Sequence, residues 1–88
     1  MSIFGNCLGQ RAEAYAPQNA EPSDIANAAV SDCDAQLNAY RTATLDHFKT
    51  LLPRDPKLAR SYSDRLTNET REKGRKAVIS KVLQLRTK

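Results

Sequence analysis

The side chains of this 88-residue chain best suited to nucleophilic or metal chemistry belong to Cys7, Cys33 and the single histidine, His47. A structural zinc site takes four Cys or His ligands, and these three residues match no metal-ligand spacing. Asp46 precedes His47, but neighbouring side chains on a helix diverge, so the carboxylate cannot orient the imidazole as a general base. We therefore expect no enzymatic activity, no metal site and no cofactor.

The two cysteines are compatible with free thiols or with a Cys7–Cys33 disulfide. Cys33 falls within an apolar helical stripe, where a free cysteine packs as a small hydrophobic residue. We favour reduced thiols, which are typical of a protein that folds in a reducing compartment.

The apolar pattern predicts an all-α protein built on a helical hairpin of two long helices. One stripe advances by three or four residues from Val30 to Leu51, and a second advances by four residues from Leu58 to Leu66. Two such helices joined by a short corner most simply fold back on each other. The hairpin core should consist of these residues: Val30, Cys33, Leu37, Tyr40, Phe48, Leu51, Leu58, Tyr62 and Leu66.

Turn and capping residues place the ends of both helices. Ser23 or Asp24 is expected to cap a first helix that runs to about residue 52. Pro53 ends it, Asp55 caps the second helix, and Pro56 takes the first position of that helix, where no N–H is needed.

Gly74 divides the second helix into two parts with different apolar faces. Leu58, Tyr62 and Leu66 point one way, whereas the apolar residues of segment 78–85 lie on nearly the opposite side. Either Gly74 breaks the helix and a short third helix follows, or one continuous helix faces two partners. We favour the break.

Residues 1–22 are predicted to form a flexible or extended N-terminal arm, with residues 23–88 as one hairpin domain. The arm has no sustained period and is rich in Ala, Gln, Asn and Pro towards its end. Its apolar residues are expected either to be disordered or to tuck against the hairpin of the same chain, or to insert into a neighbouring subunit. Together with those after Gly74 they are the candidates for contacts between subunits. These candidate assembly contacts are Ile3, Phe4, Val78, Ile79, Val82, Leu83 and Leu85.

A thin core also favours association. Leu, Ile, Val and Phe together number 17, or about 19% of the chain, which leaves little apolar area for one copy to bury. The predicted partner is the chain itself or a larger protein assembly. Under this division of the molecule, Phe48→Ala should unfold the hairpin, while Val82→Asp should spare the monomer and abolish assembly.

Charge is distributed unevenly along the chain. Residues 1–53 carry three Lys or Arg against six Asp or Glu, whereas residues 54–88 carry eleven against four. The basic half supports an alternative function as a nucleic-acid-binding module with salt-sensitive affinity. Its candidate anion contacts are Arg71, Lys73, Arg75, Lys76 and Lys81.

No apolar run is long enough to span a bilayer or to serve as the core of a signal peptide. We expect the chain to be synthesised as a soluble cytoplasmic protein. The sequence does not fix its final location, for which an exported assembly and a virion are the candidates.

The corner Pro53-x-Asp55-Pro56 followed by Leu58, Tyr62 and Leu66 resembles the corner and second helix of type III secretion needle subunits. Those are small helical hairpins that polymerise into a hollow tube. The resemblance implies that residues 56–88 line a channel. The longer first helix and the Lys/Arg-rich C-terminus depart from that family. Taken together, these observations predict a non-enzymatic assembly subunit, similar to a secretion needle protein or a small virion protein.

Overall fold

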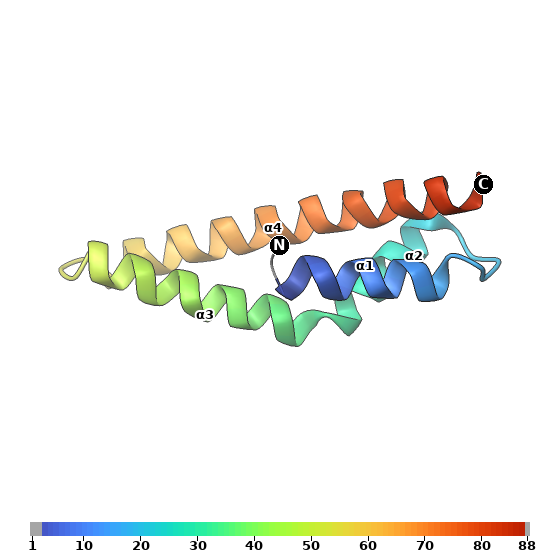
Figure 1. Cartoon of the computed structure of the whole chain (residues 1–88). Helices are drawn as coiled ribbons and strands as arrows, with labels where there is room; N and C mark the ends of the chain where they lie inside the picture. Colours follow the sequence, from blue (N-terminus) through green and yellow to red (C-terminus); the bar gives the residue numbers. More distant parts are fainter. Residues whose placement is uncertain (1–2, 88) are drawn as a thin grey trace.

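The computed structural model describes residues 3–87 and contains four helices; the predictions for Met1, Ser2 and Lys88 lie outside it. The helices are α1 (Ile3–Tyr15), α2 (Pro22–Asp32), α3 (Asp34–Leu51) and α4 (Pro56–Arg86). The predicted all-α class is confirmed. The helices pack side by side into a rod with extents of 52 × 17 × 17 Å (Figure 1).

The longest element, α4, is continuous through Gly74, so the predicted break at this glycine is wrong. Its start follows the predicted capping pattern, because the Asp55 side chain accepts a hydrogen bond from the Leu58 backbone N–H at 3.1 Å and Pro56 follows the cap. A Cβ at Gly74 would lie 2.6 Å from Leu8 Cδ1 and 3.0 Å from Phe4 Cε2. Gly74 therefore lets α1 approach α4 closely instead of ending the helix.

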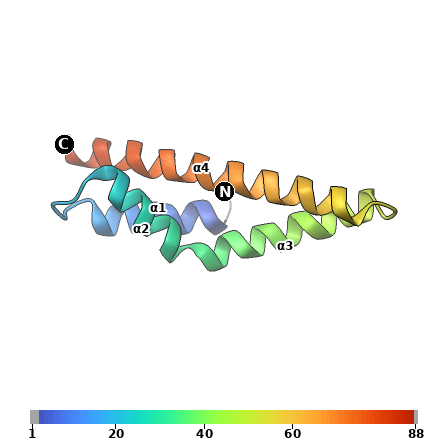
Figure 2. The ribbon, with the colours of Figure 1, turned by 180° about the vertical axis from the view of Figure 1, so that it is seen from behind.

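The single helix predicted over residues 23–52 is divided at Cys33 into α2 and α3. Cys33 has φ −99° and ψ 19°, which interrupts the helical backbone, and the disulfide to Cys7 is attached at this same residue. The start also differs from the prediction, because α2 begins at Pro22 and Glu21 occupies the cap position without a side-chain hydrogen bond. The break lets α2 and α3 follow different paths against α4 (Figure 2).

The predicted flexible or extended arm is wrong for residues 3–15, which form α1. Phe4, Leu8 and Ala12 recur every four residues, share one face of α1 and are buried. This face packs into the same core as α2, α3 and the C-terminal half of α4, so these segments form one folded unit. The core consists of Phe4, Leu8, Ala12, Ile25, Ala26, Ala29, Cys33, Leu37, Val78 and Val82.

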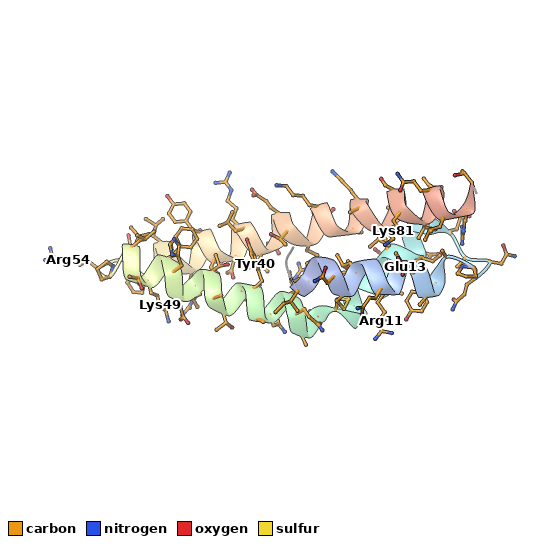
Figure 3. All side chains as sticks on the ribbon, in the orientation of Figure 1. Arg11, Glu13, Tyr40, Lys49, Arg54 and Lys81 are labelled. Carbon is orange, nitrogen blue, oxygen red and sulfur yellow. A yellow bond between two sulfur atoms is a disulfide. The ribbon has the colours of Figure 1, made fainter. Side chains whose placement is uncertain are left out.

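Two further contacts fasten the α1–α2 pair to the rest of the molecule. Arg86 near the end of α4 donates hydrogen bonds to three backbone carbonyls of the α1–α2 loop, those of Ala16 (3.1 Å), Gln18 (2.6 Å) and Ala20 (2.7 Å). Lys81 of α4 forms an ion pair with Glu13 of α1 at 3.1 Å (Figure 3). Within residues 3–87, none of the helices combines the length and apolar character needed to cross a membrane.

Candidate functional site

The two halves of the rod differ in how many helices they contain. Helix α1 runs parallel to α4, from Phe4 beside Gly74 to Glu13 beside Lys81. The first half of α4 extends beyond the start of α1 and pairs there with α3 (Figure 1). We call this two-helix part, formed by residues 40–66, the distal hairpin.

The distal hairpin leaves large apolar side chains in contact with solvent. Leu51 is 60% exposed, Leu58 38% and Tyr62 40%. The Phe48 ring is half-buried against the Tyr62 ring, with their centroids 5.5 Å apart, and Leu66 is half-buried as well. We call these five residues the open face. Large apolar side chains that stay exposed on one surface, with aromatic rings among them, are typical of a protein interaction site.

The structure buries only some of the residues predicted for the hairpin core. Cys33 and Leu37 are fully buried, and Val30 and Tyr40 are half-buried against the core. The distal members lie on the open face because two helices alone cannot enclose side chains on both sides of their contact. Ala59, Ser63 and Thr67, whose side chains are small, fill the contact between α3 and α4 instead.

Several of the predicted assembly contacts belong to the core of the chain itself. Phe4, Val78 and Val82 are 3% exposed or less, so they are not available to a partner in this fold. Ile79 and Leu85 are half-buried, while Ile3 (72%) and Leu83 (49%) are exposed. Phe4 lies on α1, and α1 covers Val78 and Val82. Because α1 was not predicted, the sequence offered no reason to place these three residues in the core.

A groove of about 420 Å³ runs between α1 and the second half of α4. Its walls are mostly apolar and include small residues, since Gly5 and Gly9 come from α1 and Ala77 from α4. Lys73 and Lys81 flank it on α4. The complete lining is Phe4, Gly5, Leu8, Gly9, Ala12, Thr70, Lys73, Gly74, Ala77, Val78 and Lys81.

Three of the five candidate anion contacts interact with neighbours in the chain. Arg71 donates a hydrogen bond to the Asn68 side chain at 2.9 Å, Arg75 pairs with Glu72 at 3.6 Å and Lys81 pairs with Glu13. The remaining two, Lys73 and Lys76, are exposed. Because residues 71, 73, 75 and 76 point to different sides of α4, the structure does not bring these cations into one stripe.

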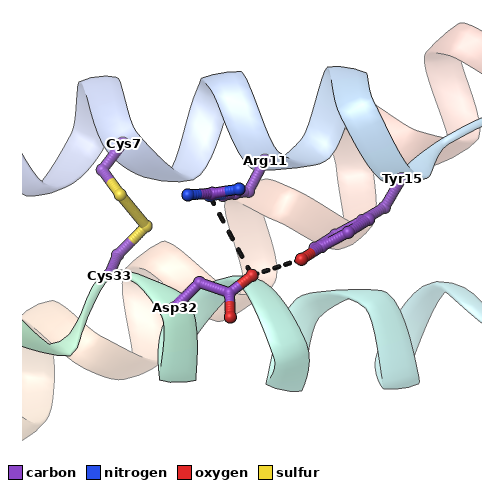
Figure 4. Close-up of a disulfide and its surroundings, with 5 residues drawn as sticks. All are labelled: Cys7, Arg11, Tyr15, Asp32 and Cys33. Carbon is purple, nitrogen blue, oxygen red and sulfur yellow. Dashed lines mark hydrogen bonds and ion pairs between the residues drawn. A yellow bond between two sulfur atoms is a disulfide. The ribbon is translucent and has the colours of Figure 1, made fainter.

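The predicted free thiols are replaced by a disulfide between Cys7 and Cys33 (Figure 4). Beside it, the Tyr15 hydroxyl donates a hydrogen bond to Asp32, and Arg11 lies 4.0 Å from the same carboxylate. The hydrogen bond to Asp32 raises the pKa of Tyr15 above its usual value of 10.0, because it favours the protonated hydroxyl. This cluster joins α1 to α2 at a second point.

Sequence reasoning missed α1 and the cluster that it positions, although a signal was present. Cys7, Arg11 and Tyr15 recur every four residues, as do Phe4, Leu8 and Ala12 on the buried face. Gly5 and Gly9 obscured this pattern because glycine lowers helix propensity.

The single histidine does not form a catalytic pair with Asp46. His47 is exposed, and its ring contacts Phe48 edge-on with centroids 5.7 Å apart. In the part of the chain that the structure describes, no group of three or more His, Cys, Asp or Glu side chains is arranged to hold a metal ion.

Comparison with known proteins finds no matching family model, no matching curated protein and no matching solved structure.

Proposed function

We propose that this chain is a non-enzymatic assembly module that binds protein surfaces through the open face of its distal hairpin. The carrying observation is the exposure of Leu51, Leu58 and Tyr62 on the half of the rod that α1 and α2 leave uncovered. Fully burying a side chain of this size contributes about 1.5–3 kcal/mol. Because Leu51, Leu58 and Tyr62 are 38–60% exposed, a partner that covers them gains about 1 kcal/mol from each.

The two halves of the rod are held together by different contacts. The disulfide, the Arg86 hydrogen bonds and the apolar core hold four segments together at one end. The distal hairpin is held by the contact between α3 and α4, including an Arg41–Asp64 ion pair at 3.5 Å and a Ser63 hydroxyl that donates to the Arg41 carbonyl. The end of the rod that contains all four helices is thus held by many contacts, and the distal hairpin presents an apolar two-helix surface beyond it.

The alternative function, nucleic-acid binding, has weaker support. A phosphate-binding surface gains from cations gathered along one path, whereas Arg71, Arg75 and Lys81 are engaged within the chain. The resemblance to needle subunits stays a prediction, and it agrees with an assembly role.

A photo-crosslinking experiment tests the proposed site. A benzophenone amino acid replaces Tyr62 in cells that express the chain, and the matched control carries it at Leu83, which is exposed to a similar degree on the same helix but outside the open face. We expect a protein adduct from position 62 and none from position 83. If position 62 gives no adduct, or only position 83 gives one, the open face is not the binding surface.

A further inference from the structure

The open face and the groove are two parts of one surface. Along α4, one row of side chains advances by three or four residues from Leu58 to Lys81 and stays within an arc of about 140° of the helix surface. The first three members of the row belong to the open face and the last four line the groove. In order, the row is Leu58, Tyr62, Leu66, Thr70, Lys73, Ala77 and Lys81.

These two parts have complementary shapes and similar chemistry. At one end Leu58 and Tyr62 project from the surface, with 38% and 40% of their area exposed. At the other end the groove is hollowed because glycine and alanine stand where larger side chains would fill it. Projecting apolar residues at one end and an apolar groove at the other are what a self-complementary surface requires.

We propose that a second copy of this chain covers this surface, antiparallel to the first and related to it by a two-fold axis beside Thr70. The inference rests on the proposed assembly function and names its partner. Tyr62 and Ala77 are fifteen residues apart on α4, about 22 Å at 1.5 Å per residue. With the axis midway between them, Tyr62 of each copy enters the groove of the other beside Ala77, and one set of contacts is made twice.

Charge near the axis supports the antiparallel arrangement. Lys73 is exposed and has no ion pair within residues 3–87, while the Glu69 side chain, which pairs with Arg65 at 3.6 Å, is 52% exposed. In the antiparallel pair, Glu69 of one copy lies within about one helical turn of Lys73 of the other. Two equivalent ion pairs can therefore form across the axis, each involving a lysine that has no counterion in the monomer.

A stable dimer has to use nearly the whole of one side of the rod. The rod is 52 Å long and 17 Å wide, so one side has a projected footprint of 52 × 17, or about 880 Å². Specific interfaces bury about 800 Å² on each partner. The distal hairpin alone is about half this length, so the groove has to take part in the interface for the dimer to be stable.

Gly9→Leu provides the decisive variant, because the added side chain occupies the groove and its Cβ fits beside Lys81. A Cβ at Gly9 meets only the Lys81 Nζ atom, at 3.5 Å, which is ordinary contact, and leucine favours a helix more than glycine does. The matched control is Ala14→Leu, which adds a leucine to an exposed position on the opposite side of α1. Sedimentation equilibrium of the oxidised chain should show a dimer whose dissociation constant rises at least tenfold with Gly9→Leu and stays within twofold with Ala14→Leu.

Crosslinking between copies tests the direction of packing. Unlabelled and ¹⁵N-labelled chains carrying the benzophenone amino acid at position 62 are mixed, irradiated and digested. We expect mixed-isotope adducts that join position 62 to residues 5–12 or 73–78 of the other copy. A chain that stays monomeric at millimolar concentration, equal effects of Gly9→Leu and Ala14→Leu, or adducts from position 62 to position 62 would overturn the two-fold arrangement. A monomer that nevertheless crosslinks to a different protein in cells would contradict only this inference and leave the assembly role supported.

Discussion

Gly9 of α1 and Gly74 of α4 both lie where these two helices pack together. Replacing each by alanine should change the free energy of unfolding in opposite directions. Gly9→Ala introduces a Cβ whose nearest neighbour is Lys81 Nζ at 3.5 Å, so the better helix propensity of alanine should stabilise the fold by about 1 kcal/mol. Gly74→Ala gains the same propensity, but its Cβ lies 2.6 Å from Leu8 Cδ1 and 3.0 Å from Phe4 Cε2.

The clash at Gly74 requires Leu8 and Phe4 to move or α1 to shift away from α4. Leu8 and Phe4 are 4% and 3% exposed and contact the core, which limits how far their side chains can rotate. Overpacking of this kind costs about 1–3 kcal/mol. The net effect of Gly74→Ala should therefore be a loss of about 0–2 kcal/mol, and the two variants should differ by about 1–3 kcal/mol.

Urea denaturation of the oxidised chain at low concentration measures this difference, with the slope m of each transition checked for equality. At 88 residues, a difference of 1 kcal/mol should also separate the melting temperatures by about 4–8 °C. If Gly74→Ala stabilises the protein as much as Gly9→Ala does, the close approach of α1 to α4 is wrong.

Three other perturbations have defined outcomes. Reduction of the Cys7–Cys33 disulfide by a dithiol should lower the free energy of unfolding by about 3.5 kcal/mol, which is the loop-closure entropy for a sequence separation of 26 residues. The control variant Cys7→Ala/Cys33→Ala should not respond to the reductant. Arg86→Lys should lower the free energy of unfolding by about 1–2 kcal/mol and speed hydrogen exchange in loop 16–21, because a lysine cannot donate to the three carbonyls in the same geometry. The control Arg60→Lys should change neither quantity. Equal effects of the two variants would rule out this role of Arg86. The folded-state pKa of Tyr15 lies above its unfolded value of 10.0, so its contribution to stability is complete below pH 10 and is lost as the pH rises through the folded-state pKa. Tyr15→Phe should remove this alkaline loss in a series of urea melts from pH 8 to 11.5, and an unchanged profile would contradict the assignment.

The structure exchanges the stability effects that the sequence predicted for Val82→Asp and Phe48→Ala. Val82 is fully buried among α1, α2 and α4, so Val82→Asp places a carboxylate in the core and should unfold the monomer. Phe48 is only half-buried on the distal hairpin, and Phe48→Ala should cost less than the roughly 3 kcal/mol or more expected for a core phenylalanine.

Local chemistry in the sequence was sufficient to place the corner between α3 and α4, although not to show that α4 continues through Gly74. Pro53, Asp55 and Pro56 end one helix and start the next because capping and the missing proline N–H act over only a few residues. Hydrophobic periodicity likewise identified the helical nature of segments 34–51 and 56–86.

Only the tertiary structure decided what α1 does and which apolar residues it covers. Gly5, Gly9 and a length of thirteen residues make α1 a weak helix by itself, so its stability depends on packing and on the disulfide to a residue 26 positions away. Such contacts join residues distant in sequence, so the four-residue repeats within α1 do not by themselves show what α1 packs against. The same packing places Val78 and Val82 inside while Leu58 and Tyr62 stay exposed, because α1 is long enough to cover only half of α4.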